Sequence, residues 1–516
     1  MIIAMLVIYI AIMIGIGLYT SKKTNSVSDF VLGGRNVGSW LTAFAYGTSY
    51  FSAVVFIGYA GQFGWKYGIS ATWIGIGNAI IGSALAWIVL GKRTRTMTKH
   101  FNARTMPEFF EHRFKSKSLK IASALIVFFF LIPYTASVYN GLSRLFEMAL
   151  NVPYSACIIA MAVLTAIYVI LGGYTATAIN DFIQGIIMLV GIILVVVIAV
   201  GKAGGLSTAL NELGSITDVG VPENSLNSIF GPDPQSLLGV VLLTSLGTWG
   251  LPQMIHKFYA IKDEAAIKKG TIISTIFAIV VSCGSYFLGG FNRIFNTIEP
   301  EIASKTGRAL INVNNGRPDF DAMIPTLLEN TMPLIIIGVI VVLVLSASMS
   351  TLSALVLTSS STLTIDLIKP SYKKEMTEKK EMLIMRILIA VFLIISVVIA
   401  LNKNNYISTL MSISWGALAG SFLGPFTYGL FSKKITKASV WASFITGTGI
   451  TIVHMFLFSL NLFPNLANKV NPLVLSPINA GAFAMIISLI IVPVISMFTP
   501  KMDRKNVDEI FSCYEK

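Results

Sequence analysis

Charged residues are scarce in this chain. Only 12% of its 516 residues are Asp, Glu, Lys or Arg, whereas 54% are hydrophobic and the mean hydropathy is +0.76. Soluble domains carry about twice that share of charge. Stretches such as 2–19 and 185–200 contain no charged residue, and a membrane-spanning helix needs about 20 apolar residues. The composition therefore excludes a soluble globular protein and predicts an all-α chain that crosses the lipid bilayer many times.

Cysteine and histidine are also rare, with three and four residues respectively. Cys157, Cys283 and Cys513 are far apart, and their spacing suggests neither a disulfide nor a metal site. His454 is isolated in an apolar segment, where hydrogen-bonded packing is favoured over a proton relay. The sequence has no grouping of His, Asp and Ser typical of a catalytic site, so we expect a protein that is not an enzyme.

The first apolar segment, 1–19, has no basic stretch before it, and its positive charges, Lys22 and Lys23, follow it. A secretory signal peptide has the opposite arrangement. We therefore expect this segment to be retained as the first membrane helix.

The positive charge of the chain follows its predicted topology. Thirteen apolar segments can be counted as spans: 1–19, 38–63, 68–91, 120–148, 154–171, 180–201, 236–259, 270–294, 332–366, 381–401, 406–431, 436–460 and 476–498. With the N-terminus outside, 29 of the 38 Lys and Arg residues fall on the inner side, as basic residues do in membrane proteins. The net charge of +14 therefore does not indicate a nucleic-acid partner. It predicts a multi-pass plasma-membrane protein with its N-terminus outside and its C-terminus in the cytoplasm.

Two spans are interrupted by polar and small residues. Residues 46–53 read YGTSYFSA, and residues 247–252 read GTWGLP. Glycine lowers the energy of a bend, and Pro252 removes a backbone donor. Unwound backbone inside a membrane must line a cavity or bind something. Two kinked helices that pack through small residues are the alternative, but interruptions five spans apart favour a binding site between two inverted five-helix repeats.

The five-span separation of the two interruptions divides the chain into predicted units. They are an N-terminal extra helix and inner loop (1–37), a first five-helix repeat (38–201), an extracellular loop (202–235), a second five-helix repeat (236–431), and C-terminal helices with a short cytoplasmic tail (432–516). Each repeat would begin with its broken helix.

The ninth span carries a stripe of hydroxyl groups. Ser346, Ser350 and Ser353 lie on one face at helical spacing, with Thr351 beside them. Such a stripe is typical of a close-packing seam between helices. It also suits a hard monovalent cation, which prefers neutral or singly charged oxygens. The residues alone leave both interpretations open.

Five motifs, in a constant order, together resemble the sodium:solute symporter family. They are Asp29-Phe30 with Leu32-Gly33-Gly34-Arg35, GTSYFSA (47–53), GGYTATAINDFIQG (172–185), GTWGLPQMIHKF (247–258) and SMSTLSALVLTSSSTLTIDL (348–367). The similarity covers roughly residues 1–460. This family includes proline, pantothenate, sialate, iodide and sodium/glucose cotransporters. The resemblance implies a LeuT-like fold and Na+-coupled import of a small organic solute by alternating access.

The resemblance also implies a main Na+ site between the second and ninth spans. Its ligands would be the backbone carbonyls of Thr48, Phe51 and Ala347 and the hydroxyls of Ser350 and Thr351. An unwound turn at this point would free the carbonyls, and Gly47 would let the chain open.

Some family members bind a second Na+ at an aspartate and at hydroxyls of the ninth span. Asp181, Ser350 and Ser353 match that pattern, but Ala354 stands where those members carry another serine. Asp181 is equally well interpreted as an acid at a helix N-terminus, satisfied by the first-turn amides. The number of Na+ ions stays open.

The resemblance places a solute between the two breaks. The candidate substrate-binding residues are Tyr50, Ser52, Ala53, Tyr134, Thr244, Thr248 and Trp249. Ser52, Tyr134 and Pro252 agree with proline symporters, whereas Tyr50, Ala53-Val54, Thr244 and Thr248 replace their aspartate, glycine–tryptophan pair and aromatic residues. Ser49-Tyr50, Ser52-Ala53 and Lys66-Tyr67-Gly68 look closer to the pantothenate branch. A carboxylate-bearing solute suits both branches, because half-helix N-termini favour an anion.

The alternatives are a solute sensor that signals through a separate partner and a proton-coupled transporter of the same fold. The tail from 501 to 516 is too short for a fused catalytic domain, and the retained Ser350 and Thr351 favour Na+ over a proton. We expect a small organic solute and the bilayer as partners, and no obligate protein partner. Arg144 and Glu147 are expected to pair within their span, and Arg293 either guards the outer mouth or extends to the interface.

Overall fold

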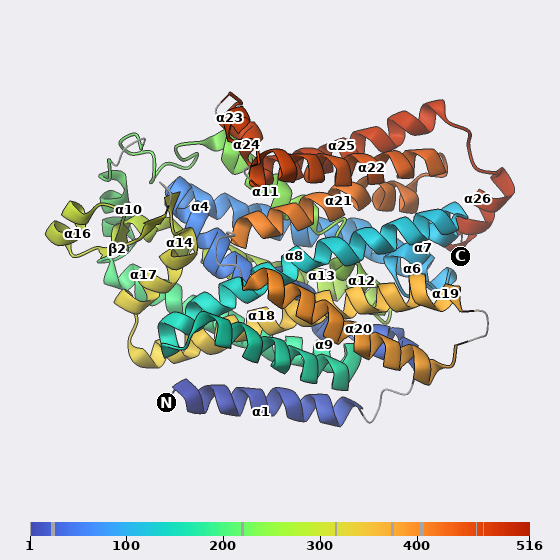
Figure 1. Cartoon of the computed structure of the whole chain (residues 1–516), viewed down its shortest axis with the longest axis horizontal. Coiled ribbons are helices and arrows are strands. Elements are labelled where there is room, and N and C mark those ends of the chain that lie inside the picture. Colours follow the sequence, from blue (N-terminus) through green and yellow to red (C-terminus); the bar gives the residue numbers. More distant parts are fainter. Residues whose placement is uncertain are drawn as a thin grey trace.

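The computed structural model describes residues 2–21, 26–217, 221–314, 317–372, 376–401, 407–460, 462–467 and 469–515. Lys22 and Lys23, the positive charges that follow the first apolar segment, lie outside these ranges. The described chain is 84% helix and 2% strand, which confirms the expected all-α architecture (Figure 1).

The helices that make up the bundle run roughly along one axis (Figure 1). They are α1 (Ile2–Ser21), α3 (Ser39–Tyr50), α4 (Ala60–Tyr67), α8 (Lys117–Leu150), α9 (Tyr154–Lys202), α11 (Pro234–Gly247), α12 (Pro252–Ala260), α13 (Glu264–Ala278), α14 (Gly284–Gly290), α18 (Leu334–Thr362), α20 (Glu378–Ala400), α21 (Ile407–Phe431), α22 (Lys437–His454) and α25 (Pro477–Phe498). Several of them continue into π-helical segments: η2 (Val54–Tyr59), η4 (Asn78–Leu85), η5 (Trp87–Gly91), η6 (Ile279–Cys283), η8 (Leu363–Ile368) and η9 (Met455–Ser459).

Short elements connect and cap these helices. They are α2 (Val27–Leu32), α5 (Thr72–Gly77), α6 (Lys92–His100), α7 (Met106–Phe114), α10 (Leu206–Gly214), α15 (Asn292–Phe295), α16 (Pro300–Thr306), α17 (Met323–Thr331), α19 (Lys369–Ser371), α23 (Pro464–Ala467), α24 (Pro472–Leu475) and α26 (Arg504–Phe511), with 3-10 turns η1 (Gly33–Arg35), η3 (Gly68–Ala71), η7 (Phe320–Ala322) and η10 (Ser512–Tyr514). Strands β1 (Asn296–Thr297) and β2 (Ala309–Leu310) pair in parallel, and β3 (Val313–Asn314) and β4 (Arg317–Pro318) pair antiparallel.

Eleven helical stretches of the described residues are long and apolar enough to span a membrane, so the count of thirteen is not confirmed. Two of the eleven, Val54–His100 and Tyr154–Lys202, contain a glycine in a left-handed conformation. Gly68 has φ 60° and Gly173 has φ 57°, and each marks a sharp turn that a side chain would strain. Dividing both stretches there would give thirteen, and that number stays a prediction.

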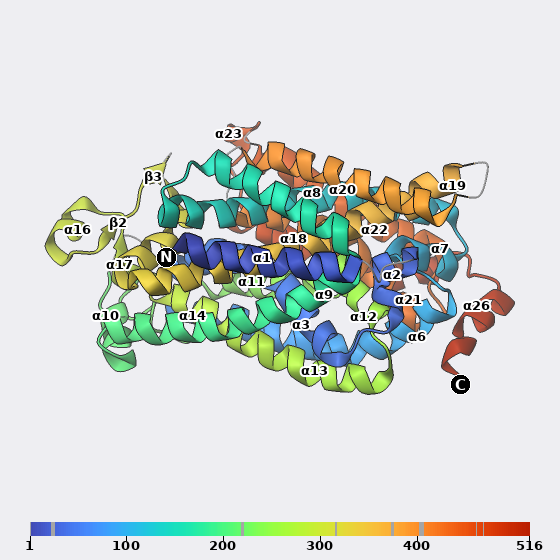
Figure 2. The ribbon, with the colours of Figure 1, turned by 90° about the horizontal axis from the view of Figure 1, so that it is seen from below.

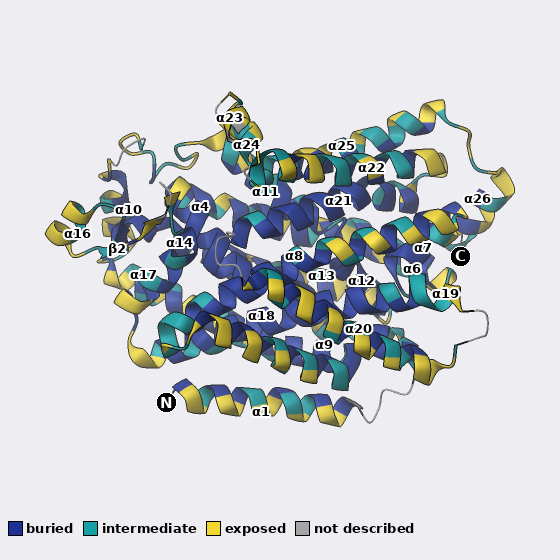
Figure 3. Cartoon of the chain, in the orientation of Figure 1, coloured by how far each residue is buried: buried dark blue, intermediate teal, exposed yellow. Residues whose placement is uncertain are grey.

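The two chain ends lie at opposite ends of the bundle. Helices α10, α16 and α17 gather at the N-terminal end, and α6, α7, α19 and α26 gather at the C-terminal end (Figures 1 and 2). The helices differ in how much of their surface is covered. In α21, 94% of the most apolar window is buried, against 28% in α1 and in α20. Figure 3 shows the same contrast, so α21 belongs to the interior while α1 and α20 offer an outer face to lipid.

Both expected helix breaks are present. Helix α3 ends at Tyr50, and Phe51, with φ −104° and ψ 88°, leaves the helical conformation before the chain resumes as η2. Helix α11 ends at Gly247, and α12 begins at Pro252. Pro252 suits the first turn of a helix because that position needs no backbone donor.

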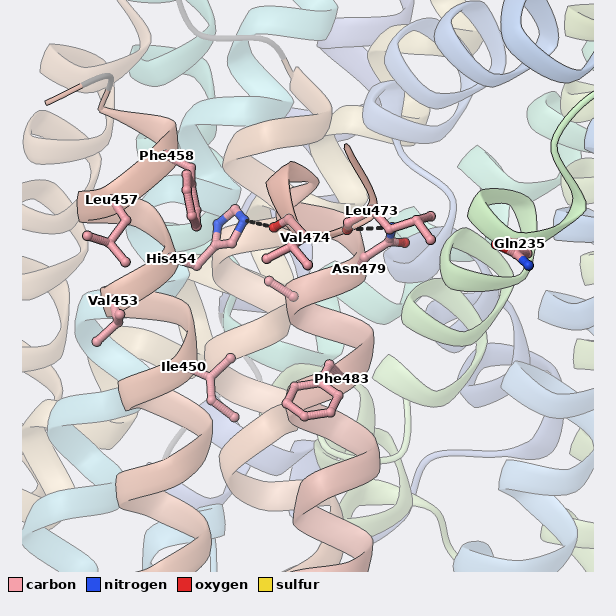
Figure 4. Close-up of a pocket in the computed structure, with 11 residues that line it drawn as sticks. Gln235, Ile450, Val453, His454, Leu457, Phe458, Leu473, Val474, Asn479 and Phe483 are labelled. Atoms are coloured by element: carbon pink, nitrogen blue, oxygen red, sulfur yellow. Dashed lines mark hydrogen bonds between the residues drawn. The ribbon is translucent and has the colours of Figure 1, made fainter. Parts of the chain in front are cut away.

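A cavity of about 610 Å³ lies away from both breaks, among α11, α22, α24 and α25 (Figure 4). Its lining is almost entirely apolar, with Ile450, Val453 and Phe483 among its members. The ring of His454 lies at its edge, and its Nε2 is 2.9 Å from the carbonyl oxygen of Val474. This contact bears out the expectation that His454 is a hydrogen-bonded packing residue.

Candidate functional site

The break in the second span lies further along the sequence than expected. The Phe51 amide still donates to the Gly47 carbonyl at 3.0 Å, so the chain is helical around Gly47. A Cβ at Gly47 would lie 2.4 Å from Cδ1 of Phe277. Gly47 therefore permits α13 to pack closely on α3. The expectation that Gly47 itself lets the chain open is wrong, because the helix leaves its path at Phe51–Ser52.

The carbonyls of the last turn of α3 have lost their partners within the helix, and α18 supplies new ones. The Ser350 hydroxyl donates to the Thr48 carbonyl at 3.0 Å, and the Thr351 hydroxyl approaches the same oxygen at 3.2 Å. Both hydroxyls also lie 3.0–3.1 Å from the Ala347 carbonyl. These groups are at most 1% exposed. Four of the five expected Na+ ligands thus meet at one point.

Phe51, the fifth expected ligand, lies beside this junction. It lines a cavity of about 10 Å³ together with Ser52, Met188 and Ala347. None of the residues at the junction carries a charge, and the C-terminal end of α3 points at it. The oxygens there are carbonyls and hydroxyls, and the negative end of a helix dipole favours a cation.

The residues expected at a second Na+ site have other partners in the structure. A carboxylate oxygen of Asp181 lies 3.8 Å from Nζ of Lys257, and both side chains are at most 3% exposed. The Lys257 ammonium also lies 5.3 Å from the centre of the Tyr174 ring. The Ser353 hydroxyl donates to the Ser350 carbonyl at 2.8 Å.

Asp181 does not lie at a helix N-terminus. Helix α9 turns at Gly173 and then continues through Asp181 to Lys202. Both carboxylate oxygens of Asp181 accept no hydrogen bond from the described residues. The interpretation of Asp181 as an acid satisfied by first-turn amides is therefore wrong, because the helix begins about two turns earlier than the sequence suggested.

The two breaks are tied together by one side chain. The Tyr50 hydroxyl donates to the Thr244 carbonyl at 2.7 Å, which links α3 to α11. The Tyr50 ring stacks on Phe51, with centroids 4.2 Å apart, and on Trp415, 6.0 Å away. Tyr134 meets the same indole edge-on at 5.8 Å. Tyr50 and Tyr134, both expected at the substrate site, therefore converge on Trp415.

Trp415 was not predicted from the sequence. It is fully buried in α21, and a Cβ at Gly247 would lie 2.4 Å from its ring. Its indole nitrogen donates to no described residue. The sequence signal that could have indicated Trp415 is a single bulky aromatic residue among small ones, in SISWGALAG at 412–420. A large side chain in such surroundings fills the space that its small neighbours leave.

Thr248 and Trp249 direct their polar groups to the third span. The Thr248 hydroxyl donates to the Gly82 carbonyl, and the Trp249 indole nitrogen donates to the Ile81 carbonyl, both at 2.9 Å. The Tyr46 hydroxyl also donates to Gly82, at 2.6 Å. These carbonyls belong to the π-helical segment η4. A π-helical turn is wider than an α-helical one and disturbs the regular backbone hydrogen bonding, and such turns often occur at functional sites.

The remaining substrate candidates make local contacts. The Ser52 hydroxyl accepts a hydrogen bond from the Val54 amide at 3.2 Å, where η2 begins. Ala53 packs against Gly141 of α8 so closely that a Cβ on the glycine would lie 3.1 Å from it. The Thr244 hydroxyl donates to the Val240 carbonyl at 2.9 Å.

At the N-terminal end of the bundle, Arg144 forms an ion pair with Asp319, with Nη1 and Oδ2 3.6 Å apart. The neighbouring Asp321 accepts a hydrogen bond from the Ile407 amide, the first residue of α21, at 3.2 Å. Burial raises the pKa of Asp321 to about 7, against the opposing effects of Arg144 and of this amide.

The Arg293 side chain donates to the Trp65 carbonyl at 2.8 Å and lies over the Trp65 ring at 4.1 Å. It therefore anchors α15 to α4 at the N-terminal end of the bundle.

The chain matches known proteins along most of its length. The model of the sodium:solute symporter family matches residues 30–447. A sodium/proline symporter of Staphylococcus aureus is 30% identical over 460 residues, covering 87% of this chain and 85% of that protein. The osmoregulated proline transporter OpuE of Bacillus subtilis is 28% identical over 449 residues, covering 86% and 87%.

Solved structures show the same fold. A Na+-coupled sialic acid symporter in a substrate-bound, outward-open state matches with a TM-score of 0.74 at 16% identity, covering 98% of this chain and 99% of that one. A transporter of the nucleobase-cation-symport-1 family matches with a TM-score of 0.50 at 13% identity, covering 94% and 98%. The match to the family model and the likeness to these relatives agree with the motifs, and the chain belongs to the sodium:solute symporter family.

Proposed function

We propose that this chain imports a small carboxylate-bearing solute, with Na+ held by Thr48, Phe51, Ala347, Ser350 and Thr351. Membership of the sodium:solute symporter family makes it a Na+-coupled solute symporter. The observation that carries the residue assignment is the convergence of two carbonyls of different helices with two hydroxyls of α18.

The chemistry of this junction suits Na+ better than a proton. A hydroxyl can turn its lone pairs toward a cation, and carbonyl oxygens are good ligands for hard ions. No titratable side chain is among the five residues, so nothing there could carry a transported proton. Bound Na+ would also join α3 to α18 and so favour the conformation in which these helices lie together.

The solute is expected beside this ion, near Tyr50, Ser52, Tyr134 and Trp415. Relatives named as proline transporters make proline the first solute to test, and the motifs around Tyr50 make pantothenate the second. The Tyr134 and Trp415 rings offer an apolar wall. The positive end of α12, which begins at Pro252, favours a carboxylate.

Alternating access would follow because Na+ and the solute both bind at the two helix breaks. Na+ and the solute would stabilise the same outward-facing state, and the loaded protein would then open inward. One charge that crosses 100 mV supplies roughly 2.3 kcal/mol, which corresponds to about a fiftyfold accumulation. Units 38–201 and 236–431 would be the two inverted repeats.

The charge distribution supports the orientation. The basic segments around α6, α19 and α26 gather at one end of the bundle (Figure 1), and basic residues stay in the cytoplasm. The plasma membrane would therefore hold the chain with its N-terminus outside.

Uptake by proteoliposomes tests this function. The purified chain is reconstituted, an inward Na+ gradient is imposed, and uptake of labelled proline, pantothenate, acetate and glucose is compared with uptake under a matched K+ gradient. We expect Na+-dependent accumulation of one of the carboxylates, most simply proline. Na+-dependent uptake of glucose alone would contradict the proposed solute class.

A further inference from the structure

A buried lysine supplies the positive charge that Asp181 requires. Lys257 of α12 and Asp181 of α9 form an ion pair at 3.8 Å, and their side chains are 3% and 0% exposed. A buried carboxylate is very unfavourable without a compensating charge. Since the pair is neutral as a whole, a further cation at this carboxylate would leave a net positive charge in the interior of the bundle.

Helix α18 has fewer hydroxyl groups available to complete a second ion site than the family pattern requires. Ala354 has no hydroxyl, and the Ser353 hydroxyl donates to the Ser350 carbonyl. Two glutamines lie one helical turn from the members of the ion pair. Gln253 lies one turn before Lys257, and Gln184 lies one turn after Asp181, and the side-chain oxygens of both glutamines accept no hydrogen bond from the described residues.

We propose that the Lys257 ammonium is a built-in substitute for a second Na+ at Asp181, so that this symporter binds a single Na+ at the junction of α3 and α18. The inference rests on the proposed function, and it adds the ion stoichiometry and the residue that sets it. Removal of the Lys257 charge leaves a buried carboxylate without its cation, with glutamine amides one helical turn away on both helices, and Na+ prefers such oxygen ligands.

The test is equilibrium binding of ²²Na+ to the purified full chain, with the number of bound ions per chain as the readout. We expect about one ion for the wild type, about one for Lys257→Arg, and about two for Lys257→Met. The double variant Asp181→Asn/Lys257→Met removes both charges and should return the number to about one. A purely structural role of Lys257 would change protein yield but would not add an ion.

Lys369→Met is the matched control. Lys369 pairs with Glu381, which keeps a second partner in Arg104, so this variant should bind about one ion. Asp181→Asn serves if Lys257→Met cannot be purified, because the number should then stay at about one.

Two bound ions in the wild type that fall to one in Asp181→Asn would overturn the inference, as would one ion in a folded Lys257→Met protein. Absence of saturable Na+ binding by the wild type would instead overturn the proposed function, and this inference with it.

Discussion

The Ser350 hydroxyl lies 3.0 Å from the Thr48 carbonyl, although the two residues are 302 positions apart in the chain. Thr48 belongs to the last turn of α3, whose carbonyls lose their helical partners when the chain leaves the helix at Phe51. Ser350 is on an uninterrupted part of α18. The contact therefore joins the C-terminal end of α3 to the middle of α18, and the residues that form it are those that the family motifs had indicated.

We expect Thr351→Ala to raise the Na+ concentration that gives half-maximal uptake by about tenfold or more, because loss of a ligand to a charged group costs about 1.5–3 kcal/mol. The measurement is initial uptake over a range of Na+ concentrations at saturating solute. Ser348→Ala is the control, since among the described residues its hydroxyl donates only to the Val344 carbonyl of its own helix. An unchanged Na+ dependence in Thr351→Ala would count against the site.

Tyr50→Phe is expected to impair transport at normal protein yield. The variant leaves the buried Thr244 carbonyl without its donor, which costs about 1–3 kcal/mol in the conformation where the two breaks touch. Uptake rate and expression are measured together. Tyr259→Phe is the control, because its hydroxyl bonds to no described residue. Equal uptake by both variants would show that the link between the breaks has no functional role.

Stability near neutral pH should depend on Asp321. Its pKa is raised to about 7 from an ordinary value of 3.8, so its contribution to stability is fully present below pH 4 and is lost as the pH rises through about 7. We expect Asp321→Asn, which mimics the protonated acid, to match the wild type at about pH 4 and below and to be increasingly more stable than the wild type as the pH rises to 8. The gain is a few kcal/mol at most, since one pKa unit corresponds to about 1.4 kcal/mol.

Thermal melting of detergent-solubilised protein at several pH values measures this effect. Asp319→Asn is a useful comparison, because Asp319 pairs with Arg144 at a less buried position. A parallel pH dependence of wild type and Asp321→Asn would exclude Asp321 as the titrating group.

Gly173→Ala should destabilise the fold. Gly173 has φ 57°, and an added Cβ would lie 2.8–3.1 Å from atoms of Phe30. The left-handed conformation and the overpacking together cost about 2–4 kcal/mol. The melting temperature in detergent is the measurement, and Gly201→Ala, where the added carbon meets nothing within 4 Å, should leave it nearly unchanged. Equal melting of the two variants would contradict this role for the turn.

The sequence was sufficient to predict the membrane bundle, because apolar runs of spanning length and the distribution of Lys and Arg can be recognised in short stretches of the chain. The breaks at Phe51 and at Thr248–Leu251 were also predictable, since Gly, Ser and Pro interrupt helices wherever they gather. Exact positions were less accessible. Gly47 proved to be a packing residue, because the ring that needs its space belongs to Phe277, which is distant in sequence.

Partners across the fold were also missed. Nothing near Asp181 indicates Lys257, and nothing near Tyr50 indicates Trp415, since both contacts depend on how separate helices are arranged. The expected pairing of Arg144 within its own helix overlooked Asp319 for the same reason. Local spacing predicts which residues share a helix face, but it does not predict which other helix that face meets.

The ligands of the coupling ion are tested most directly by diffraction from crystals of the full chain grown with Tl+ in place of Na+, because thallium scatters anomalously. We expect an anomalous peak bounded by the carbonyl oxygens of Thr48 and Ala347 and the hydroxyls of Ser350 and Thr351. A strong peak at another place in the bundle, with none at this junction, would contradict it.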